Sequence, residues 1–426
     1  VSGFTRACSC AVAGGSLAAA GQAGRARSLL QAELARCADE AGRAVLHAGL
    51  GGVLLCADDL SGAADHLDTA IAARGAASLP MAHLLEARLL RVLVGYRHGD
   101  WDQAAAEAER LVTLIDDLDQ GGLLPRAHLA AVYVVAARGD WRAADGHAAA
   151  AAGQPGTRAS AMALILADAR CAIAVARDDP QAVLAASGDV LGDLGLLGRL
   201  EPGMLSFWPA CAQALARTGK LAEAETVLAR FEALAESRAR RSAMATASRA
   251  RGILEAARRR PAAALAAFDA SLRHLDGLGM PLEEAMTRLE RGRLLRRTGQ
   301  RRSAARDLAT ARGLFAALGA QPFLARCDQE LSTGPQAATG PQAATGPQAA
   351  AGPASPLTAR QLAVAQAAAA GKSNRQIAAE LYISVKTVEF HLAQILARLG
   401  VDARTQIAGA LAAATGPSGA DPSSHG

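Results

Sequence analysis

The segment from Leu357 to Leu411 reads LTARQLAVAQAAAAGKSNRQIAAELYISVKTVEFHLAQILARLGVDARTQIAGAL and decides the fold of the C-terminal part of the chain. Thr358 with Gln361, and Ser373 with Gln376, have the spacing of a capping box. In a capping box, a hydroxyl and an amide side chain satisfy free backbone groups at the start of a helix. The segment therefore predicts two helix starts, one shortly after each hydroxyl.

Glycines and an apolar stripe define the remaining helix boundaries. Gly371 and Gly400 fall where an α-helix would end on a left-handed residue, which predicts that the preceding helices stop there. A third helix is predicted to begin at Ser384, and its apolar residues recur at intervals of three and four, which indicates a buried stripe. The residues of the stripe are Val388, Leu392, Ile395 and Leu399.

The face opposite this stripe is predicted to read DNA. A step of about 100° per residue places Lys386, Phe390, Ala393 and Ala397 farthest from the stripe. In a major groove, Phe390 can contact a thymine methyl group and Glu389 can accept a hydrogen bond from cytosine N4. The alternative is a small helical domain in which Phe390 packs on the rest of the protein and Lys386 is merely solvated.

The motifs LTARQ, GKSNRQIAAEL, ISVKTVEFHL and LARLGVDAR closely resemble the LuxR-type helix-turn-helix domain, in the version carried by the large ATP-binding regulators of that family. The resemblance implies that the helix containing SVKTVEFHL enters the major groove and that the last helix pairs two copies. The implied base contacts are Thr387, Val388, Glu389, Phe390 and Ala393. The implied phosphate contacts are Ser373, Asn374, Arg375, Lys386 and His391. The implied dimerisation residues are Arg404, Ile407, Ala408 and Leu411.

Four positions qualify this resemblance. Val388 also lies on the buried stripe, so a purely structural role is an equal alternative for it. Gln361 and Ala363 stand where acidic residues are usual in the family, which puts a structural salt bridge in doubt. Ala393 offers no hydrogen-bond donor where some members carry lysine, which suggests fewer base contacts.

Residues 1–330 predict an array of helical repeats. A turn signature recurs at multiples of about 40 residues, a period in the range of helical repeat proteins. Most of these turns are followed five residues later by an alanine, which would let the next helix approach closely. Helix pairs of this kind cannot bury their apolar faces alone and must stack. The eight predicted turns start at Gly21, Asp58, Gly99, Gly139, Asp178, Gly219, Arg259 and Gly299.

A large apolar residue stands nine positions after most of these turns, as at Leu30, Leu67, Leu228, Phe268 and Leu308. The pattern resembles tetratricopeptide-like repeats with a longer period, and also the repeat region of the large ATP-binding LuxR-type regulators. HEAT-like stacking is the alternative. The predicted fold is all-α: a tetratricopeptide-like helical repeat superhelix plus a C-terminal four-helix LuxR-type helix-turn-helix domain.

Composition sets the domain boundaries. Residues 1–330 form the predicted repeat array, and residues 331–356 carry TGPQAA three times in tandem, which predicts a flexible linker because regular prolines discourage helix. Residues 357–413 form the predicted DNA-binding domain. Residues 414–426 are expected to be a disordered tail.

The sequence predicts a protein that is not an enzyme and has no cofactor. Gly371-Lys372-Ser373 ends like a phosphate-binding loop, but Gln366 stands where that loop requires glycine, and neither HExxH nor GxSxG occurs. Acidic pairs such as Asp58-Asp59 are interpreted as helix caps. The seven cysteines include no CxxC pair, which favours a reducing, cytoplasmic compartment and argues against a metal site. No membrane-spanning run is present.

These observations predict a sequence-specific transcriptional regulator that binds double-stranded DNA as a homodimer, with RNA polymerase as a candidate second partner. The helical repeats are expected to sense a ligand or protein partner on a surface that contains Trp101, Trp141 and Trp208; the alternative is that these tryptophans fill the space between helices. Two other functions stay open: a repeat scaffold with a residual DNA-binding domain, and the C-terminal part of an ATP-dependent LuxR-family regulator.

Overall fold

The computed structural model describes residues 3–73, 81–118, 122–153, 160–191, 201–204, 206–332, 359–380, 388, 392, 395–396, 399, 401 and 403–415. The chain divides into two compact units, Val1–Gln336 and Ala337–Gly426, which we call the N-terminal unit and the C-terminal unit. All regular elements of the described residues are helices, in agreement with the predicted all-α class. The predicted linker lies almost wholly outside the described residues, and so does most of the predicted tail.

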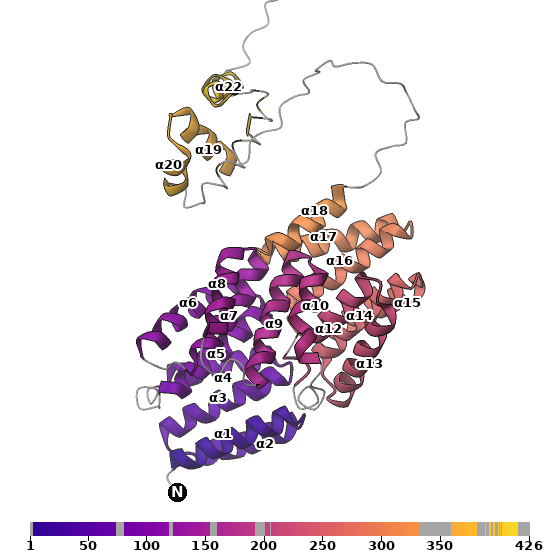
Figure 1. Cartoon of the computed structure of the whole chain (residues 1–426). Helices are drawn as coiled ribbons and strands as arrows, with labels where there is room; N and C mark the ends of the chain where they lie inside the picture. The colour runs from indigo at the N-terminus through magenta and orange to yellow at the C-terminus, as the bar shows by residue number, and fades with distance from the viewer. Residues whose placement is uncertain are drawn as a thin grey trace, which may run out of the picture. The chain divides into compact units, whose positions relative to one another are not determined.

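Helices that are neighbours in sequence pack in pairs through the N-terminal unit, from α1 and α2 at one end to α16, α17 and α18 at the other (Figure 1). Its helices are α1 (Gly3–Ala19), α2 (Ala23–Arg36), α3 (Glu40–Cys56), α4 (Leu60–Ala72), α5 (Met81–His98), α6 (Trp101–Asp117), α7 (Leu124–Arg138), α8 (Trp141–Gly153), α9 (Ser160–Arg177), α10 (Pro180–Leu191), α12 (Phe207–Arg217), α13 (Leu221–Ser237), α14 (Arg241–Ala257), α15 (Pro261–Leu275), α16 (Pro281–Arg297), α17 (Arg301–Leu318) and α18 (Gln321–Ser332).

The turns within the helix pairs lie where the sequence predicts them. All eight predicted turn residues have a positive φ, between 58° and 99°. At Gly99 the chain leaves α5 with the N–H groups of Gly99 and Asp100 both donating to the carbonyl of Gly95, which satisfies the end of the helix. The alanines predicted to allow close approach are buried. These are Ala26, Ala63, Ala104, Ala144, Ala224, Ala264 and Ala304.

Within four helix pairs, a glycine of the first helix faces the large apolar residue of the second helix, at a constant spacing of 16 residues. A methyl group added at Gly51 would lie 2.4 Å from Leu67 Cγ, so the two helices pack more closely than any side chain at residue 51 would allow. In the pair formed by α7 and α8 the sizes are exchanged: Val132 stands on the first helix and Ala148 on the second. The four glycine pairs are Gly14/Leu30, Gly51/Leu67, Gly252/Phe268 and Gly292/Leu308.

The N-terminal unit returns on itself. Helix α16 contacts α5, and α18 contacts both α7 and α9. The guanidinium group of Arg326 on α18 donates to the carbonyl oxygens of Val175 and Ala176 on α9, and Arg217 joins Asp178 to Glu290. One apolar core therefore includes residues of α5 to α7 together with residues of α16 to α18. The tetratricopeptide-like assignment itself stays a prediction.

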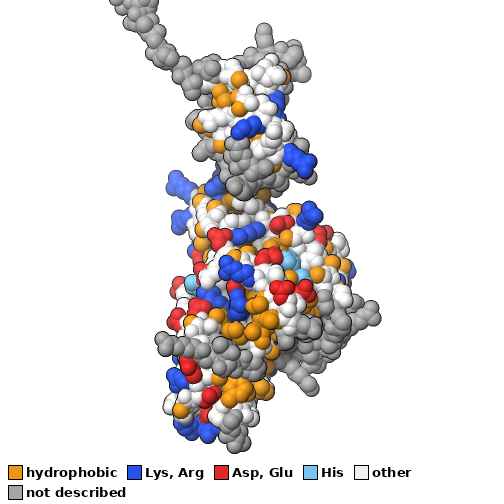
Figure 2. Space-filling model, turned by 90° about the vertical axis from the view of Figure 1, so that its left-hand side faces the viewer, with side chains coloured by type: hydrophobic (Ala, Val, Ile, Leu, Met, Phe, Trp, Pro, Cys, Tyr) orange, Lys and Arg blue, Asp and Glu red, His pale blue; other side chains and the backbone are white. Residues whose placement is uncertain are grey.

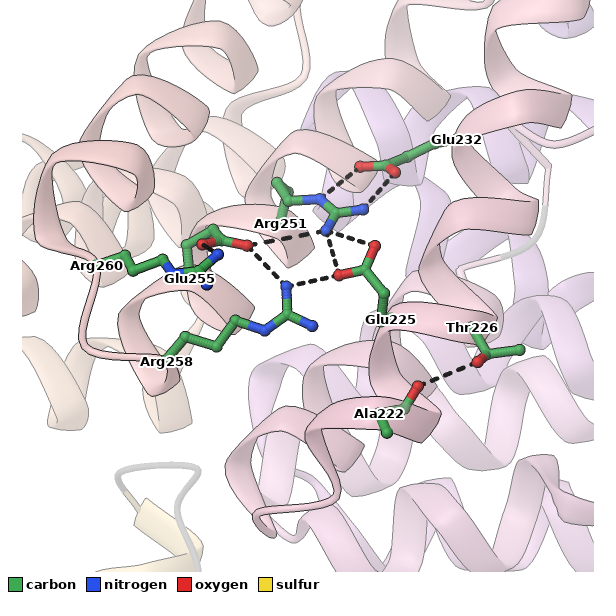
Figure 3. A network of polar contacts seen from close by, with 8 residues as sticks. All are labelled: Ala222, Glu225, Thr226, Glu232, Arg251, Glu255, Arg258 and Arg260. Atoms are coloured by element: carbon green, nitrogen blue, oxygen red, sulfur yellow. Dashed lines mark hydrogen bonds and ion pairs between the residues drawn. The ribbon is translucent and has the colours of Figure 1, made fainter.

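Ion pairs also join neighbouring helices on the outside of the stack. Arg251 of α14 donates to Glu225 at 2.7 Å and to Glu232 at 3.0 Å, both on α13, and Arg258 donates to Glu225 at 2.6 Å (Figure 3). The hydrogen bond from Arg251 is the main reason that the pKa of Glu225 lies below its ordinary value. On the face seen in Figure 2, acidic and basic side chains are interspersed over this unit, so it presents both signs of charge.

Candidate nucleic-acid interface

The C-terminal unit places two helices on either side of a tight turn. Helix α19 (Ala359–Ala369) ends before Gly371, which has a φ of 78°, and α20 (Asn374–Glu380) begins three residues later. The N–H of Gly371 donates to the carbonyl of Ala368, and the N–H of Lys372 donates to that of Ala367. The predicted end of the first helix is therefore confirmed. The later elements are a 3₁₀ turn at Arg404–Gln406 and α22 (Ile407–Thr415).

A capping box fixes the start of α20, as the sequence predicts. The N–H of Ser373 donates to Gln376 Oε1 at 2.8 Å, and the N–H of Gln376 faces Ser373 Oγ at 3.4 Å. The corresponding prediction for Thr358 lies outside the described residues.

The predicted apolar stripe packs into the core of the C-terminal unit. Val388 and Ile395 are fully buried, Leu392 is buried and Leu399 is half-buried. They contact apolar residues of α19, α20 and α22, including Val364 and Ile377. Their inward packing agrees with the buried stripe that the sequence predicts.

The predicted DNA contacts fall into four groups. Ser373 and Arg375 are exposed at the start of α20, where a phosphate could approach them. Asn374 is half-buried, and its Oδ1 accepts a hydrogen bond from Arg404 Nη1 at 2.5 Å. Val388 is 0% exposed, which favours its alternative role as a core residue over contact with a base. The others, which lie outside the described residues, are Lys386, Thr387, Glu389, Phe390, His391 and Ala393.

The predicted dimerisation residues lie on different sides of the last helix. Ile407 is 0% exposed and belongs to the core of the unit itself, and Leu411 packs against that core. Ala408 is exposed. Arg404 is held within the unit by its bonds to Asn374 and to the carbonyl of Lys372. In this conformation, Ala408 is thus the only one of the four with an exposed side chain, and no pattern in the sequence indicated that Ile407 belongs to the core.

The acidic pairs act as helix caps and ion-pair partners, as the sequence predicts. Asp59 caps α4 by accepting from the N–H of Gly62 at 2.9 Å, and Asp179 accepts from the N–H of Ala182 at 3.0 Å. Burial raises the pKa of Asp178, but the guanidinium groups of Arg326 and Arg217 outweigh this and hold that pKa below its ordinary value. These carboxylates are therefore committed to holding helices together.

The tryptophans do not form a shared binding surface. Trp101 is buried and donates through Nε1 to the carbonyl of Tyr96 at 2.8 Å, and Trp208 donates to the carbonyl of Val227 at 3.0 Å. The ring of Trp141 lies beneath the guanidinium group of Arg177, 5.1 Å away. The expectation that they hold a signal is replaced by the alternative, that they fill space between helices.

One feature of the N-terminal unit has no counterpart in the predictions. A cavity of about 390 Å³ lies between α5, α7, α9, α12, α14 and α16, with Phe323 of α18 also lining it. Each of these helices contributes a few residues from one face, and the cavity exists because the stack returns on itself. No local motif in the sequence marks it, because the lining residues are spread from Leu89 to Phe323.

The two helices, the capped turn and the buried stripe define the class of the C-terminal unit: a helix-turn-helix DNA-binding domain. The family described as "Bacterial regulatory proteins, luxR family" matches residues 355–410. These residues therefore form a LuxR-family helix-turn-helix domain, as the sequence motifs predict. Among the described residues, no helix combines the length and apolar character needed to cross a membrane.

Two curated proteins of Bacillus subtilis (strain 168) are similar to the chain over 52 residues. One is "Transcriptional regulatory protein LiaR", at 46% identity, and the other is "Uncharacterized transcriptional regulatory protein YhcZ", at 52% identity. Each match covers 12% of this chain and 25% or 24% of the relative. The chain thus spans about a quarter of the length of these relatives, and the similarity concerns a domain and not the whole protein.

Proposed function

We propose that the protein is a sequence-specific, DNA-binding transcriptional regulator of the cytoplasm whose N-terminal unit senses a ligand or a protein partner. The LuxR-family match at residues 355–410, on a unit with a capped α20 and an inward-facing Val388 stripe, is the observation that supports DNA binding. Regulation is supported by the printed names of the two similar proteins. Sensing is supported by the cavity in the N-terminal unit.

The proposed DNA contacts divide into positioning and reading. Ser373 and Arg375 are exposed next to the turn and would bind phosphate, which fixes the domain on the duplex without sequence preference. Thr387, Glu389 and Phe390 would contact bases, because helical spacing places Phe390 opposite the predicted stripe and Thr387 and Glu389 beside it.

Two copies are proposed to bind paired half-sites, in keeping with the symmetry of most helix-turn-helix regulators. The exposed side of α22, which includes Ala408, is the proposed contact between copies. Ile407 is left out of that contact because it is buried within its own unit. RNA polymerase is the proposed partner of the DNA-bound dimer.

Selection of genomic duplex fragments by the full-length protein tests this function. We expect enrichment of a two-fold related site, and Phe390→Ala should weaken binding to it by about 1–3 kcal/mol while leaving binding to random duplex unchanged. Arg302→Ala removes an exposed arginine from α17 and serves as the matched control, with no expected effect. A folded protein that enriches no site would favour the scaffold function instead.

The salt dependence of binding separates the phosphate contacts from the base contacts. Lys386→Ala should weaken binding to specific and random duplex alike and reduce the salt slope by roughly one, because a phosphate contact releases a counterion. The measurement is fluorescence anisotropy at several salt concentrations. A sequence-selective loss for Lys386→Ala would show that this lysine reads bases.

A further inference from the structure

The cavity of the N-terminal unit has the size and the lining of a small-molecule site. Its volume of about 390 Å³ falls in the roughly 300–1,000 Å³ range of such sites. Most of the lining side chains are apolar, including Leu89, Leu93, Ile165, Met286 and Phe323. Helix α16 packs against α5, and α18 packs against α7 and α9, so helices from both ends of this region border the cavity.

Three polar side chains in the cavity wall are buried, and each has one atom with no hydrogen-bond partner in the described part of the protein. Ser242, Arg249 and Glu201 are 2%, 4% and 5% exposed. The atoms are Ser242 Oγ, Arg249 Nε and Glu201 Oε2. An unsatisfied buried group costs about 1–3 kcal/mol, and more for a charged group, so three around one cavity call for an explanation.

The remaining atoms of these residues are firmly held. Arg249 pairs with Glu283 through Nη1, and Glu201 Oε1 accepts from Arg240 Nε at 2.7 Å. The backbone N–H of Ser242 donates to Asp58 Oδ2 at 2.9 Å. The wall is therefore fixed by the protein's own contacts, and the groups left without a partner are a donor on Arg249, an acceptor on Glu201, and both on Ser242.

A second polar group in the same wall, around Asp168, differs because its carboxylate has hydrogen-bond partners within the protein. Asp168 is buried, and it accepts from Tyr133 Oη at 2.6 Å, from the N–H of Phe207 at 2.6 Å and from Ser206 Oγ at 3.1 Å. Burial raises the pKa of this carboxyl group, although the three hydrogen bonds oppose the shift. Asp168 thus has a structural role, and the groups available to a ligand lie on Glu201, Ser242 and Arg249.

The positions of these groups give the shape of the ligand. Ser242 and Arg249 lie seven residues apart on one face of α14, with Thr246 between them also lining the cavity, which corresponds to a distance of about 10 Å along the helix. Glu201 lies at the Ser242 end, because its partner Arg240 precedes Ser242 by two residues. The cavity therefore has a donor at one end, an acceptor at the other and an apolar wall between them.

The charged side chains in the wall already have partners within the protein. Arg249 is paired with Glu283, Glu201 with Arg240, and Arg126 with Glu86. Arg97 donates to the carbonyl of Gly203, and Asp168 accepts three hydrogen bonds. A charged ligand would add an uncompensated charge to a mostly apolar site, which is costly. An uncharged ligand can form hydrogen bonds with the remaining atoms at no such cost.

We propose that this cavity binds an uncharged, elongated, mostly apolar small molecule, with an acceptor oxygen on Arg249 Nε and a hydroxyl or amine donor on Glu201 and Ser242. The proposal deepens the sensing role given above and rests on it for its biological meaning. It names the class of signal and the residues that recognise it. The tryptophans take no part, because none of them lines the cavity.

The test uses 6-propionyl-2-dimethylaminonaphthalene, an uncharged, elongated fluorophore with a ketone at one end, whose emission reports the polarity around it. Full-length protein should bind it saturably, with a blue shift. Arg249→Lys keeps the positive charge beside Glu283 but removes the Nε donor, and should weaken binding roughly tenfold. Unchanged affinity in Arg249→Lys would overturn the assigned recognition.

A second pair of variants tests the location. Ala172 lines the cavity, so Ala172→Phe should fill it and abolish saturable binding, whereas Ala222→Phe on the exposed face of α13 should bind like the parent. Equal binding by both would overturn the proposal. Circular dichroism shows whether each variant is folded. If Ala172→Phe is unfolded, the affinity of Arg249→Lys for the fluorophore is the test of the proposal. The assay contains no DNA, so loss of fluorophore binding with intact DNA selection rejects the cavity, and the reverse rejects the DNA-binding function.

Discussion

The two units of this protein build their cores in different ways. In the N-terminal unit, apolar residues form several clusters, most of them made by helices that are close in sequence, and one that joins α5 to α7 with α16 to α18. In the C-terminal unit, the described buried residues form one cluster that draws on every helix. A change in the first unit should therefore be felt locally, whereas a change in the second should be felt throughout.

The largest effect is expected in the C-terminal unit. Ile407→Ala should cost about 2–5 kcal/mol, because it removes a fully buried side chain from the one cluster of a small unit. Amide hydrogen exchange should rise together over α19, α20 and α22, and specific DNA binding should be lost. Thr405→Ser, at an exposed position of the 3₁₀ turn, is the control. Loss of dimerisation alone, with normal exchange, would show that Ile407 serves a partner copy.

A smaller and more local effect is expected in the N-terminal unit. A methyl group at Gly252 would lie 2.6 Å from Phe268 Cε1, so Gly252→Ala should cost about 1–3 kcal/mol through overpacking. Hydrogen exchange should rise in α12 to α16 and stay unchanged in α1 to α4. Gly313→Ala on α17, where an added methyl group meets nothing within 4 Å, is the matched control. Uniformly faster exchange over the whole unit would contradict the comparison.

The smallest expected effect is on the pH dependence of stability, and it comes from two histidine pairs in equivalent positions of two helix pairs. The Nδ1 atoms of His47 and His66 lie 2.8 Å apart, and those of His128 and His147 lie 2.9 Å apart. Burial, then the facing histidine, lowers the pKa of His47 and of His128 below 6.5. The folded state therefore binds fewer protons than the unfolded state below that pH, and stability present above pH 6.5 should decline as the pH falls through the lowered values.

Urea denaturation at pH 7.5, 6.5 and 5.5 measures this dependence. The double variant His47→Gln, His128→Gln should show a flatter decline than the parent protein. In the pair formed by α5 and α6, Arg88 and Glu107 stand opposite each other at the same 19-residue spacing. Replacing these two residues should leave the pH dependence of stability unchanged. A parent protein that is equally stable at all three pH values would contradict the assigned pKa shifts.

Much of the fold could be predicted because it depends on local chemistry. The positive φ at Gly99 and Arg259, the buried Ala104 and the capping box at Ser373 all follow from spacings within a few residues. The glycines that face large residues also left a signal, a constant spacing of 16, which was missed because helical glycine is normally unfavourable.

The cavity and the role of Ile407 could not be predicted in this way. The cavity depends on the return of α18 to α7 and α9, and nothing near Ser242 or Arg249 in the sequence indicates that contact. Ile407 fits an outward apolar face as well as an inward one, and only the packing of α22 against α19 decides between them. Both features depend on contacts between segments that are far apart in the chain, and local sequence patterns do not indicate such contacts.

The contacts of α18 with α7 and α9 also determine when the N-terminal unit can complete its fold during translation. Helix pairs from α1 to α15 can settle against neighbours that have just been made, because their contacts are mostly with the adjacent pair. The bond from Arg326 to the carbonyl of Val175 spans 151 residues and cannot form before the last helix of the unit has been translated. The closing wall of the cavity is therefore the final part of the N-terminal unit to be translated, so a nascent chain would become able to bind a signal only as the ribosome moves on to the DNA-binding domain.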